Sequence, residues 1–361
     1  MAEKSAFRVL YVDDEITDRV TRGIQRRLSL SGELECTLLR PTVNLVENIS
    51  YIQDALLVDL DLTTQSSEES PASYFGSTLA AEVRLRNPAC PIILITREQV
   101  LAGRDQLMKA NFDVDLILYK DDFADNYAPI TEEIVTLIRG FKALDRLKQQ
   151  NRGWEGVIEL LQASALEEAL LREAGPPVQE RQWNVPQTVR WLRSIVLEYP
   201  GIFYDELTAA TRLGIDVEAF GNASIQELLA PAKYVGPFSA TKPRWWRERL
   251  FYIARELTTK HGFHGSISRT FRDAVEAELQ TDIAPALCVY DGTATADWVC
   301  YIERKPVKQS NSIPYYPDNR PSVMDQARVS FTAVKYNNKF DETRVDKDAY
   351  DIVRELWGLN R

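Results

Sequence analysis

The sequence has few of the residues from which covalent and metal cross-links are built. Its 361 residues include four cysteines and two histidines. The cysteines are scattered and form no CxxC pair, which argues against a zinc knot or a disulfide framework and favours free thiols in a reducing cytoplasm. The histidines, His261 and His264, have no acid or cysteine beside them at ligand spacing. We therefore expect a cytoplasmic protein whose chemistry rests on other residues.

Long apolar runs are also missing. No run approaches the roughly 20 residues that a membrane span requires, and the N-terminal stretch MAEKSAF lacks the apolar core of a signal peptide. Hydrophobic residues make up 45% of the chain and charged residues 27%, which is usual for a globular protein and argues against disorder. We expect about two domains at this length, and no membrane partner.

Positive charge is scarce overall but concentrated in one segment. The net charge is −10, yet residues 230–272 carry nine Lys or Arg against two Asp or Glu. Basic residues interleaved with aromatic ones can bind phosphates and stack on bases. The alternative is that the aromatic residues form the core side of a helix over 244–259, with the arginines on its solvated face. The candidates for nucleic-acid contacts are Arg244, Arg247 and Arg249.

Apolar, strand-like runs alternate with helical patterns through the first 150 residues. Helical periodicity follows the first run, with Ile16, Val20, Ile24 and Leu28 four residues apart, and further helices are expected within 43–53, over 76–87 and after 130. Five strands that alternate with helices predict an α/β domain with a doubly wound, five-stranded parallel sheet. The expected strands are 9–12, LECTLL (34–39), ALLVDL (55–60), PIILIT (91–96) and DLILYK (115–120).

Polar side chains stand at the ends of four of these strands. The carboxyl ends of parallel strands meet at one rim, where ligands bind in such sheets. Converging carboxylates suit magnesium, and a neutralised carboxylate can attack phosphorus as a covalent nucleophile. A hydroxyl and an ammonium can then hold oxygens of the phosphoryl group. The residues concerned are Asp13 and Asp14 after the first strand, Asp59 and Asp61 at the third, Thr96 at the fourth and Lys120 at the fifth.

The stretches VLYVDDE, DALLVDLDL, PIILIT and LILYK resemble, in order, the motifs of the response-regulator receiver domain, over about residues 7–150. The resemblance implies a flavodoxin-like fold with Asp59 as phosphoacceptor. It also implies Mg²⁺ as cofactor, with Asp59 beside Asp13 and Asp14, and with the backbone carbonyl of Asp61 as a further ligand. Thr96 would be the switch hydroxyl and Lys120 the phosphoryl-binding lysine. The implied partner is a sensor histidine kinase or a phosphotransfer protein.

Three positions depart from the receiver pattern. Asp121 follows the lysine where the family usually has proline, and Ile117 stands where it has the switch aromatic. Arg97 occupies a position that is usually small, where it could shield the phosphoryl group or pair with it. The loop at 63–75 is long and polar, either a flap or an insertion. We expect intact phosphorylation chemistry with an altered relay.

Beyond the receiver, residues 131–175 read as nearly continuous helix that closes at Gly175, so a helical linker is expected at 151–182. The segment 189–230 is faintly similar to a winged helix. Its expected third helix, DVEAFGNASIQELL, lacks Lys and Arg, which disfavours DNA reading by that helix. ALCVYDG and WVCYIER predict a hairpin around Asp291.

Residues 183–361 are expected to form an α+β output domain that resembles no family. Three outputs remain open. Nucleic-acid binding would follow from the basic segment. A phosphate sink or protein-interaction component of a signalling complex, for instance one of defence, would follow from the overall acidity and the missing switch aromatic. An enzymatic effector is supported only by a polar cluster, Asp318, Arg320, Asp325 and Arg328. We expect no enzymatic activity beyond the receiver's own phosphorylation and dephosphorylation, and leave homodimerisation open.

Overall fold

The chain forms two compact units. The computed structural model describes residues 6–42, 45, 53–62, 75–97, 114–178, 183–294, 296–318, 320–321 and 323–358. One unit comprises residues 1–161 and 177–191, and the other comprises 162–176 and 192–361. The segment 151–182, which the sequence suggested as a linker, is therefore divided between the two units.

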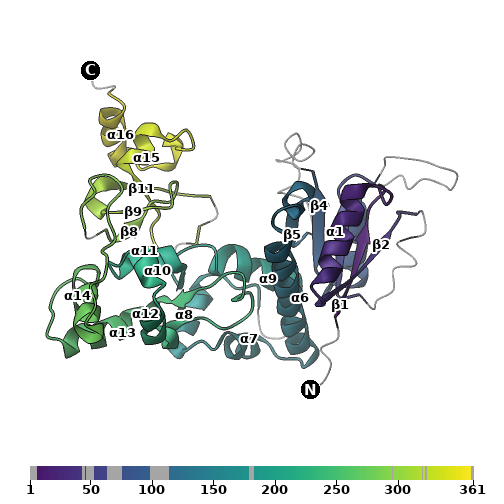
Figure 1. The fold of residues 1–361 in the computed structure, drawn as a ribbon, viewed down its shortest axis with the longest axis horizontal. Helices are drawn as coiled ribbons and strands as arrows, with labels where there is room; N and C mark the ends of the chain where they lie inside the picture. The colour runs from purple at the N-terminus through teal and green to yellow at the C-terminus, as the bar shows by residue number, and fades with distance from the viewer. Residues whose placement is uncertain are drawn as a thin grey trace. The chain divides into compact units, whose positions relative to one another are not determined.

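A five-stranded sheet forms the centre of the first unit (Figure 1). Every neighbouring pair is parallel, and the strand order is β2-β1-β3-β4-β5. This is the order of flavodoxin-like, doubly wound folds, so the predicted fold class is confirmed. The strands are β1 (Phe7–Val12), β2 (Leu34–Leu39), β3 (Ala55–Asp59), β4 (Ile92–Thr96) and β5 (Leu116–Tyr119).

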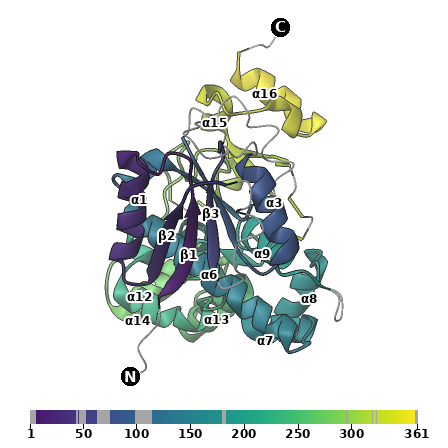
Figure 2. The same ribbon diagram turned by 90° about the vertical axis from the view of Figure 1, so that its right-hand side faces the viewer.

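Helices cover both faces of this sheet. Helix α1 (Arg19–Leu30) and helix α3 (Gly76–Arg86) lie on opposite sides of it (Figure 2). Asp18 begins α1 by accepting hydrogen bonds from the backbone N–H groups of Val20 and Thr21. Strands β3 and β4 are buried over their whole lengths, as expected for central strands covered on both faces. The expected helix within 43–53 lies almost entirely outside the described residues.

The expectation of one nearly continuous helix over 131–175 was wrong. Helix α6 (Tyr127–Gln149) is followed by α7 (Trp154–Leu161) and α8 (Ala165–Glu173). Asn151 and Gln162 have φ values of 56° and 57°, which end the preceding helices. Ser164 then begins α8 with a capping box. The run of Leu and Glu suits helix throughout, but these local stop signals interrupt it.

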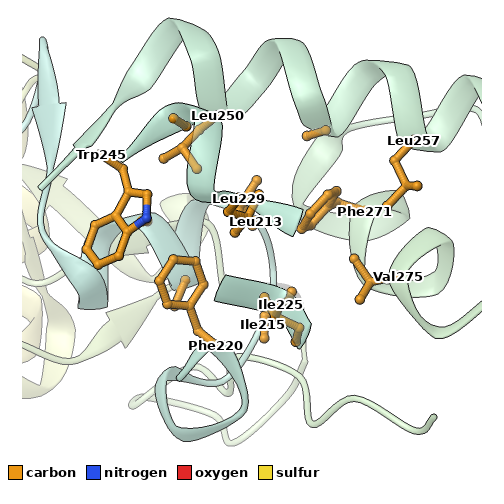
Figure 3. Close-up of a cluster of buried hydrophobic side chains, with 14 of the residues drawn as sticks. Leu213, Ile215, Phe220, Ile225, Leu229, Trp245, Leu250, Leu257, Phe271 and Val275 are labelled. Carbon is orange, nitrogen blue, oxygen red and sulfur yellow. The ribbon is translucent and has the colours of Figure 1, made fainter. Parts of the chain in front are cut away.

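A helical core organises the second unit. Buried side chains from five helices, among them Phe220 and Phe271, converge in it together with Trp245 (Figure 3). Trp245 packs edge-on against Phe220, with ring centroids 5.2 Å apart. Most aromatic residues of the basic segment are thus core residues, although Tyr252 is 62% exposed. The helices are α10 (Glu206–Arg212), α11 (Val217–Phe220), α12 (Ala223–Leu228), α13 (Arg247–Lys260) and α14 (Ile267–Leu279).

Short antiparallel strand pairs complete the second unit, and the α+β expectation is confirmed. The pairs are β6 (Phe203–Tyr204) with β7 (Trp245–Trp246), β8 (Trp298–Val299) with β9 (Pro306–Val307), and β10 (Ser312–Pro314) with β11 (Arg328–Ser330). Two further helices follow, α15 (Phe331–Tyr336) and α16 (Tyr350–Leu356). The prediction that ALCVYDG and WVCYIER pair as a hairpin around Asp291 was wrong, because β8, which lies in the second stretch, pairs with β9.

The winged-helix-like pattern expected over 189–230 holds for the helix that Asp205 begins and for the turn after it, but not for the third helix. Gly214 has a φ of 75°, and a Cβ there would lie 1.9 Å from the carbonyl oxygen of Ser268. Asp216 accepts a hydrogen bond from the backbone N–H of Glu218 and begins α11. The expected third helix is instead two short helices, α11 and α12. Such short helices present no long recognition face. Within the described part of the chain, no helix has the length and apolarity to cross a membrane.

Candidate functional site: an acidic cluster at the end of the parallel sheet

Strand register places the predicted site residues at one edge of the sheet. Val12 pairs with Val58, so Asp13 and Asp59 follow the ends of neighbouring strands. Asp59 in turn pairs with Ile95, the residue before Thr96. Thr96 pairs with Tyr119, the residue before Lys120. The local sequence explains the arrangement, because each apolar run buries its strand up to the residue that carries the polar group.

Lys120 lies between two carboxylates. Its Nζ is 2.8 Å from Oδ2 of Asp13 and 2.5 Å from Oδ2 of Asp59. All three residues are buried, and Asp59, which is 8% exposed, is the most accessible of them. Thr96 is also buried, at the end of the adjacent strand. A buried ammonium that bridges two carboxylates fixes their positions, and of these two acids Asp59 is the more exposed.

Asp13 is held by donors from its own surroundings. Its Oδ2 accepts hydrogen bonds from the Tyr11 hydroxyl at 2.6 Å and the Thr21 hydroxyl at 3.3 Å. Its Oδ1 accepts one from the backbone N–H of Glu15 at 2.8 Å. Burial and the nearby Asp13 charge raise the pKa of Tyr11, so the phenol stays a hydrogen-bond donor. The Asp13 side chain is therefore oriented before any ligand arrives.

Burial raises the pKa of Asp59 to about 6. The Lys120 ammonium acts in the opposite direction, while the neighbouring Asp13 adds to the rise. Burial alone would lower the pKa of Lys120, but the Asp59 and Asp13 carboxylates outweigh it and raise that pKa. Lys120 therefore remains a cation, and its single charge compensates only part of the negative charge around it.

The carboxylates fit a hard divalent cation. Oxygens of Asp13, Asp14 and Asp59 all lie within 4.8 Å of one another. Three carboxylate oxygens are the ligands that Mg²⁺ takes, with water in its remaining positions. Asp61 is not among the three carboxylates of this group, and the role of its main-chain carbonyl as a ligand stays a prediction. The residues present thus fit the expected magnesium, with Asp14 the more accessible of the first pair.

Glycine is required where helix α3 meets strand β3. The backbone N–H of Gly76 donates to the carbonyl oxygen of Leu60 at 3.0 Å. A Cβ on Gly76 would lie 1.8 Å from the carbonyl oxygen of Asp59. No other residue permits this approach, because a side chain would collide with the backbone. Gly76 therefore fixes the backbone at Asp59, a role that the sequence alone did not reveal.

The departures from the receiver pattern have structural counterparts. The turn after β5 is a 3₁₀ helix, Lys120–Phe123, which includes Asp121 and ends on the buried Phe123. Arg97 pairs with Glu15 at 3.0 Å, and both side chains are partly exposed. Ile117 is half-buried in β5. All but the last residue of the loop 63–75 lies outside the described residues.

The first unit combines the strand order β2-β1-β3-β4-β5, helices on both faces of the sheet and a group of acids at its carboxyl edge. The first unit has the fold of a receiver domain. It is similar to the receiver domain of the putative response regulator NarL from Mycobacterium tuberculosis, with 22% identity, coverage of 38% of this chain and 98% of the other, and a TM-score of 0.28. It is also similar to the response regulator TrrA from Thermotoga maritima, in complex with Mg²⁺-BeF, with 19% identity, coverage of 36% and 98%, and a TM-score of 0.27.

A third similar structure is the receiver domain of a putative Luxo repressor protein from Vibrio parahaemolyticus. The identity is 12%, the alignment covers 39% of this chain and 97% of the other, and the TM-score is 0.30. No family model matches the chain, and no curated protein sequence does. The similarity to these three structures concerns only the fold of the first unit.

The three arginines expected to contact nucleic acid have partners within the second unit. Arg244 donates from Nε to the carbonyl oxygen of Leu197 at 2.7 Å. Arg247 pairs with Glu248 at 2.8 Å, and its Nη1 lies 3.4 Å from Oδ1 of Asp325. The partners of Arg249 are the carboxylate of Glu167 and the carbonyl of Gln162. Contacts of these arginines with nucleic acid stay a prediction. The internal partners disfavour them, because the guanidinium groups would have to leave contacts that stabilise the fold.

The polar cluster at 318–328 is part of a larger network. Oδ2 of Asp325 accepts hydrogen bonds from the Tyr204 hydroxyl at 2.8 Å and from Arg212 at 2.5 Å. Arg320 donates to the carbonyl oxygen of Asp325 at 2.7 Å. Sequence reasoning missed Tyr204 and Arg212, because they lie more than a hundred residues from Asp325 and no spacing signal connects them.

Proposed function

We propose that the protein is a response-regulator-like phosphoacceptor, in which phosphorylation of Asp59 controls the second unit. The observation that carries the proposal is the position of Lys120 Nζ, which lies within 2.8 Å of both Asp13 and Asp59. In the unphosphorylated protein this buried lysine holds the Asp59 carboxylate, and after phosphorylation it can bind a phosphoryl oxygen. Asp14 completes the group of acids that fits Mg²⁺.

The chemistry follows from the carboxylates. An oxygen of Asp59 attacks the phosphorus of a phosphohistidine or a small acyl phosphate, and the bond from phosphorus to the donor breaks as the new oxygen–phosphorus bond forms. The leaving group takes the electron pair. Mg²⁺ would offset repulsion between the carboxylate and the phosphoryl oxygens when bound by Asp13 and Asp14. Lys120 and Thr96 then bind oxygens of the phosphoryl group.

The partner in this proposal is a sensor histidine kinase or a phosphotransfer protein, in the cytoplasm. Arg97 and Glu15 form an ion pair between partly exposed side chains at the edge of the site. Release of Glu15 would let Arg97 meet the new negative charge on Asp59. This exchange is the relay that we propose in place of the missing switch aromatic at Ile117.

Labelling with a small phosphodonor tests the proposal. The full chain, incubated with ³²P-labelled acetyl phosphate and Mg²⁺, is expected to take up label that alkaline hydroxylamine removes, as an acyl phosphate does. Asp59→Asn should abolish the uptake, and Asp13→Ala or Asp14→Ala should weaken Mg²⁺ binding and so raise the Mg²⁺ concentration that uptake requires. Thr96→Ala should leave uptake largely intact, because its hydroxyl acts after the transfer.

Asp121→Asn is the matched control. Asp121 is exposed and follows Lys120 directly, but it is not one of the clustered carboxylates among the described residues. This variant should take up label as the wild type does. Label that persists in Asp59→Asn would refute Asp59 as the acceptor, and loss of label in Asp121→Asn would place the site elsewhere.

A further inference from the structure

The second unit contains a large cavity that the receiver chemistry does not use. Its volume is about 690 Å³, within the range of roughly 300–1,000 Å³ typical of small-molecule sites. Its described lining comes from segments between Glu198 and Arg344 and combines aromatic with charged side chains. Six of these are Lys or Arg and four are Asp or Glu, a net charge of +2 in a chain whose total is −10. The cavity therefore favours an anion.

Two of the cationic side chains are held by neutral groups. Arg244 donates to the carbonyl oxygens of Leu197 and Pro243, at 2.7 and 2.9 Å. Arg320 donates to the carbonyl oxygens of Met324 and Asp325. Neither forms an ion pair with a carboxylate among the described residues. Carbonyl groups fix the orientation of a guanidinium without cancelling its charge. The carboxylates of Asp205 and Glu198 act on Arg244 electrostatically but are not at ion-pair distance, so both arginines can still contact an anionic ligand.

Lys339 adds a third positive charge to the lining, from an exposed position. The described residues offer it no carboxylate at ion-pair distance. The other arginines of the cavity are paired, as Arg304 is with Asp205 and Arg344 with Asp318 and Asp341. The positive charge that remains is thus concentrated on a few side chains, which suits a compact anionic group such as a phosphate.

Aromatic side chains form another part of the same wall. Tyr301 and Tyr315 have ring centroids 5.6 Å apart and an interplanar angle of 34°. Tyr315 is buried, whereas Tyr301 is 39% exposed and presents part of its ring to the cavity. Trp298 already stacks with the guanidinium of Arg212, at 3.7 Å from its ring centroid. Exposed ring faces beside cationic groups bind planar, electron-rich molecules.

We infer that this cavity binds a nucleotide, with its base against Tyr301 and its phosphates against Arg244, Arg320 and Lys339. The volume suits one nucleotide rather than a polymer. Both features are needed, because the cations alone would accept any small anion and the tyrosines alone any apolar ring. The inference concerns the second unit and does not depend on phosphorylation of Asp59, so Asp59→Asn should bind the same ligand equally well.

Equilibrium binding to the full chain tests the inference. The probes are the four ribonucleoside triphosphates, with adenosine and tripolyphosphate as the separate halves of ATP. We expect at least one nucleotide to bind saturably, and roughly tenfold or more tightly than either half. No saturable binding of any triphosphate at low salt would overturn the inference. Tripolyphosphate binding as tight as that of the nucleotides would also overturn it, because the base would then make no contact.

Paired variants locate the binding. Lys339→Glu should raise the Kd roughly tenfold, whereas Lys335→Glu, an exposed lysine outside the lining, should leave it unchanged. Tyr301→Ala should weaken nucleotide binding but not tripolyphosphate binding, and Tyr336→Ala is its exposed control. Circular dichroism should show all four variants folded. Equal weakening by the control and cavity variants would place the ligand elsewhere and refute the assignment.

Discussion

Arg249 and Glu167, which lie 82 residues apart in the sequence, form a bidentate ion pair. Nε of Arg249 donates to Oε1 of Glu167 at 2.8 Å, and Nη2 donates to Oε2 at 2.7 Å. The Glu167 side chain is only 2% exposed, and it also accepts the hydrogen bond of the Ser164 backbone N–H that begins α8. The pair therefore joins α8 to α13 within the second unit.

Removal of this arginine should destabilise the protein. Arg249→Ala leaves a buried carboxylate without its guanidinium, which is expected to lower the free energy of unfolding by about 3–5 kcal/mol. Arg255→Ala, an exposed arginine on the same helix, should change it by less than about 0.5 kcal/mol. Urea denaturation of both variants measures the difference. Equal stability of the two would show that the ion pair contributes nothing to the fold.

The same result decides how nucleic-acid binding must be tested. Because Arg249 supports the fold, its loss would weaken any binding indirectly, so the exposed pair Arg255 and Arg269 gives a cleaner test. Duplex binding through the basic segment should weaken with salt at a log–log slope of about −0.9 per phosphate contacted. Arg255→Ala with Arg269→Ala should flatten that slope. No duplex binding at low salt would refute the nucleic-acid output.

Lys120→Gln should reveal the electrostatic strain of the acidic cluster. Without the ammonium, Asp13 and Asp59 repel each other in a buried site, and we expect a loss of about 3–5 kcal/mol of stability in EDTA. Added Mg²⁺ should restore part of it by supplying positive charge. The control is Lys142→Gln, whose pair with Asp54 is half-exposed on the lysine side and should contribute less than about 1 kcal/mol. Urea midpoints that fall equally for both variants would contradict the account.

Asp205 should make the second unit sensitive to acid. Burial acts to raise its pKa, but Arg304 and the hydrogen bond from the Thr208 backbone N–H outweigh burial and lower the pKa from its ordinary value. A pKa that is lower in the folded state adds stability above the unfolded pKa, and that stability is lost as the pH falls through the folded pKa. Asp205→Asn, which can still cap α10, should therefore lose about 1–3 kcal/mol at pH 7 and little in strong acid.

Denaturation across this pH range measures the effect. The difference between wild type and Asp205→Asn should shrink steadily below about pH 4, the ordinary range of an aspartate. Asp216→Asn is the control, because Asp216 also caps a short helix, with its Oδ1 2.9 Å from the backbone N of Glu218, but has no ion pair among the described residues. A constant difference for Asp205→Asn at all pH values would show that its charge does not matter.

The receiver and its site could be read from the sequence because both depend on local pattern. Each apolar run is long enough to be a buried strand, and each polar residue follows its run directly. In a parallel sheet these positions must share one edge, so Asp13, Asp59 and Lys120 could be predicted to meet without any knowledge of tertiary contacts. What the pattern did not contain was Gly76, whose importance comes from a backbone approach rather than from a chemical group.

The second unit was decided by contacts between distant segments. The sequence around Asp291 suits a hairpin, yet β8 pairs with β9, because strands this short are stabilised by what they pack against rather than by their own pairing. The local sequence of Arg249 suits a solvated cation, yet in the folded chain it pairs with Glu167. Asp325 looked like one acid in a polar stretch, although Tyr204 and Arg212 converge on it. A local pattern shows which residues are charged, but only the packed chain determines which charges meet.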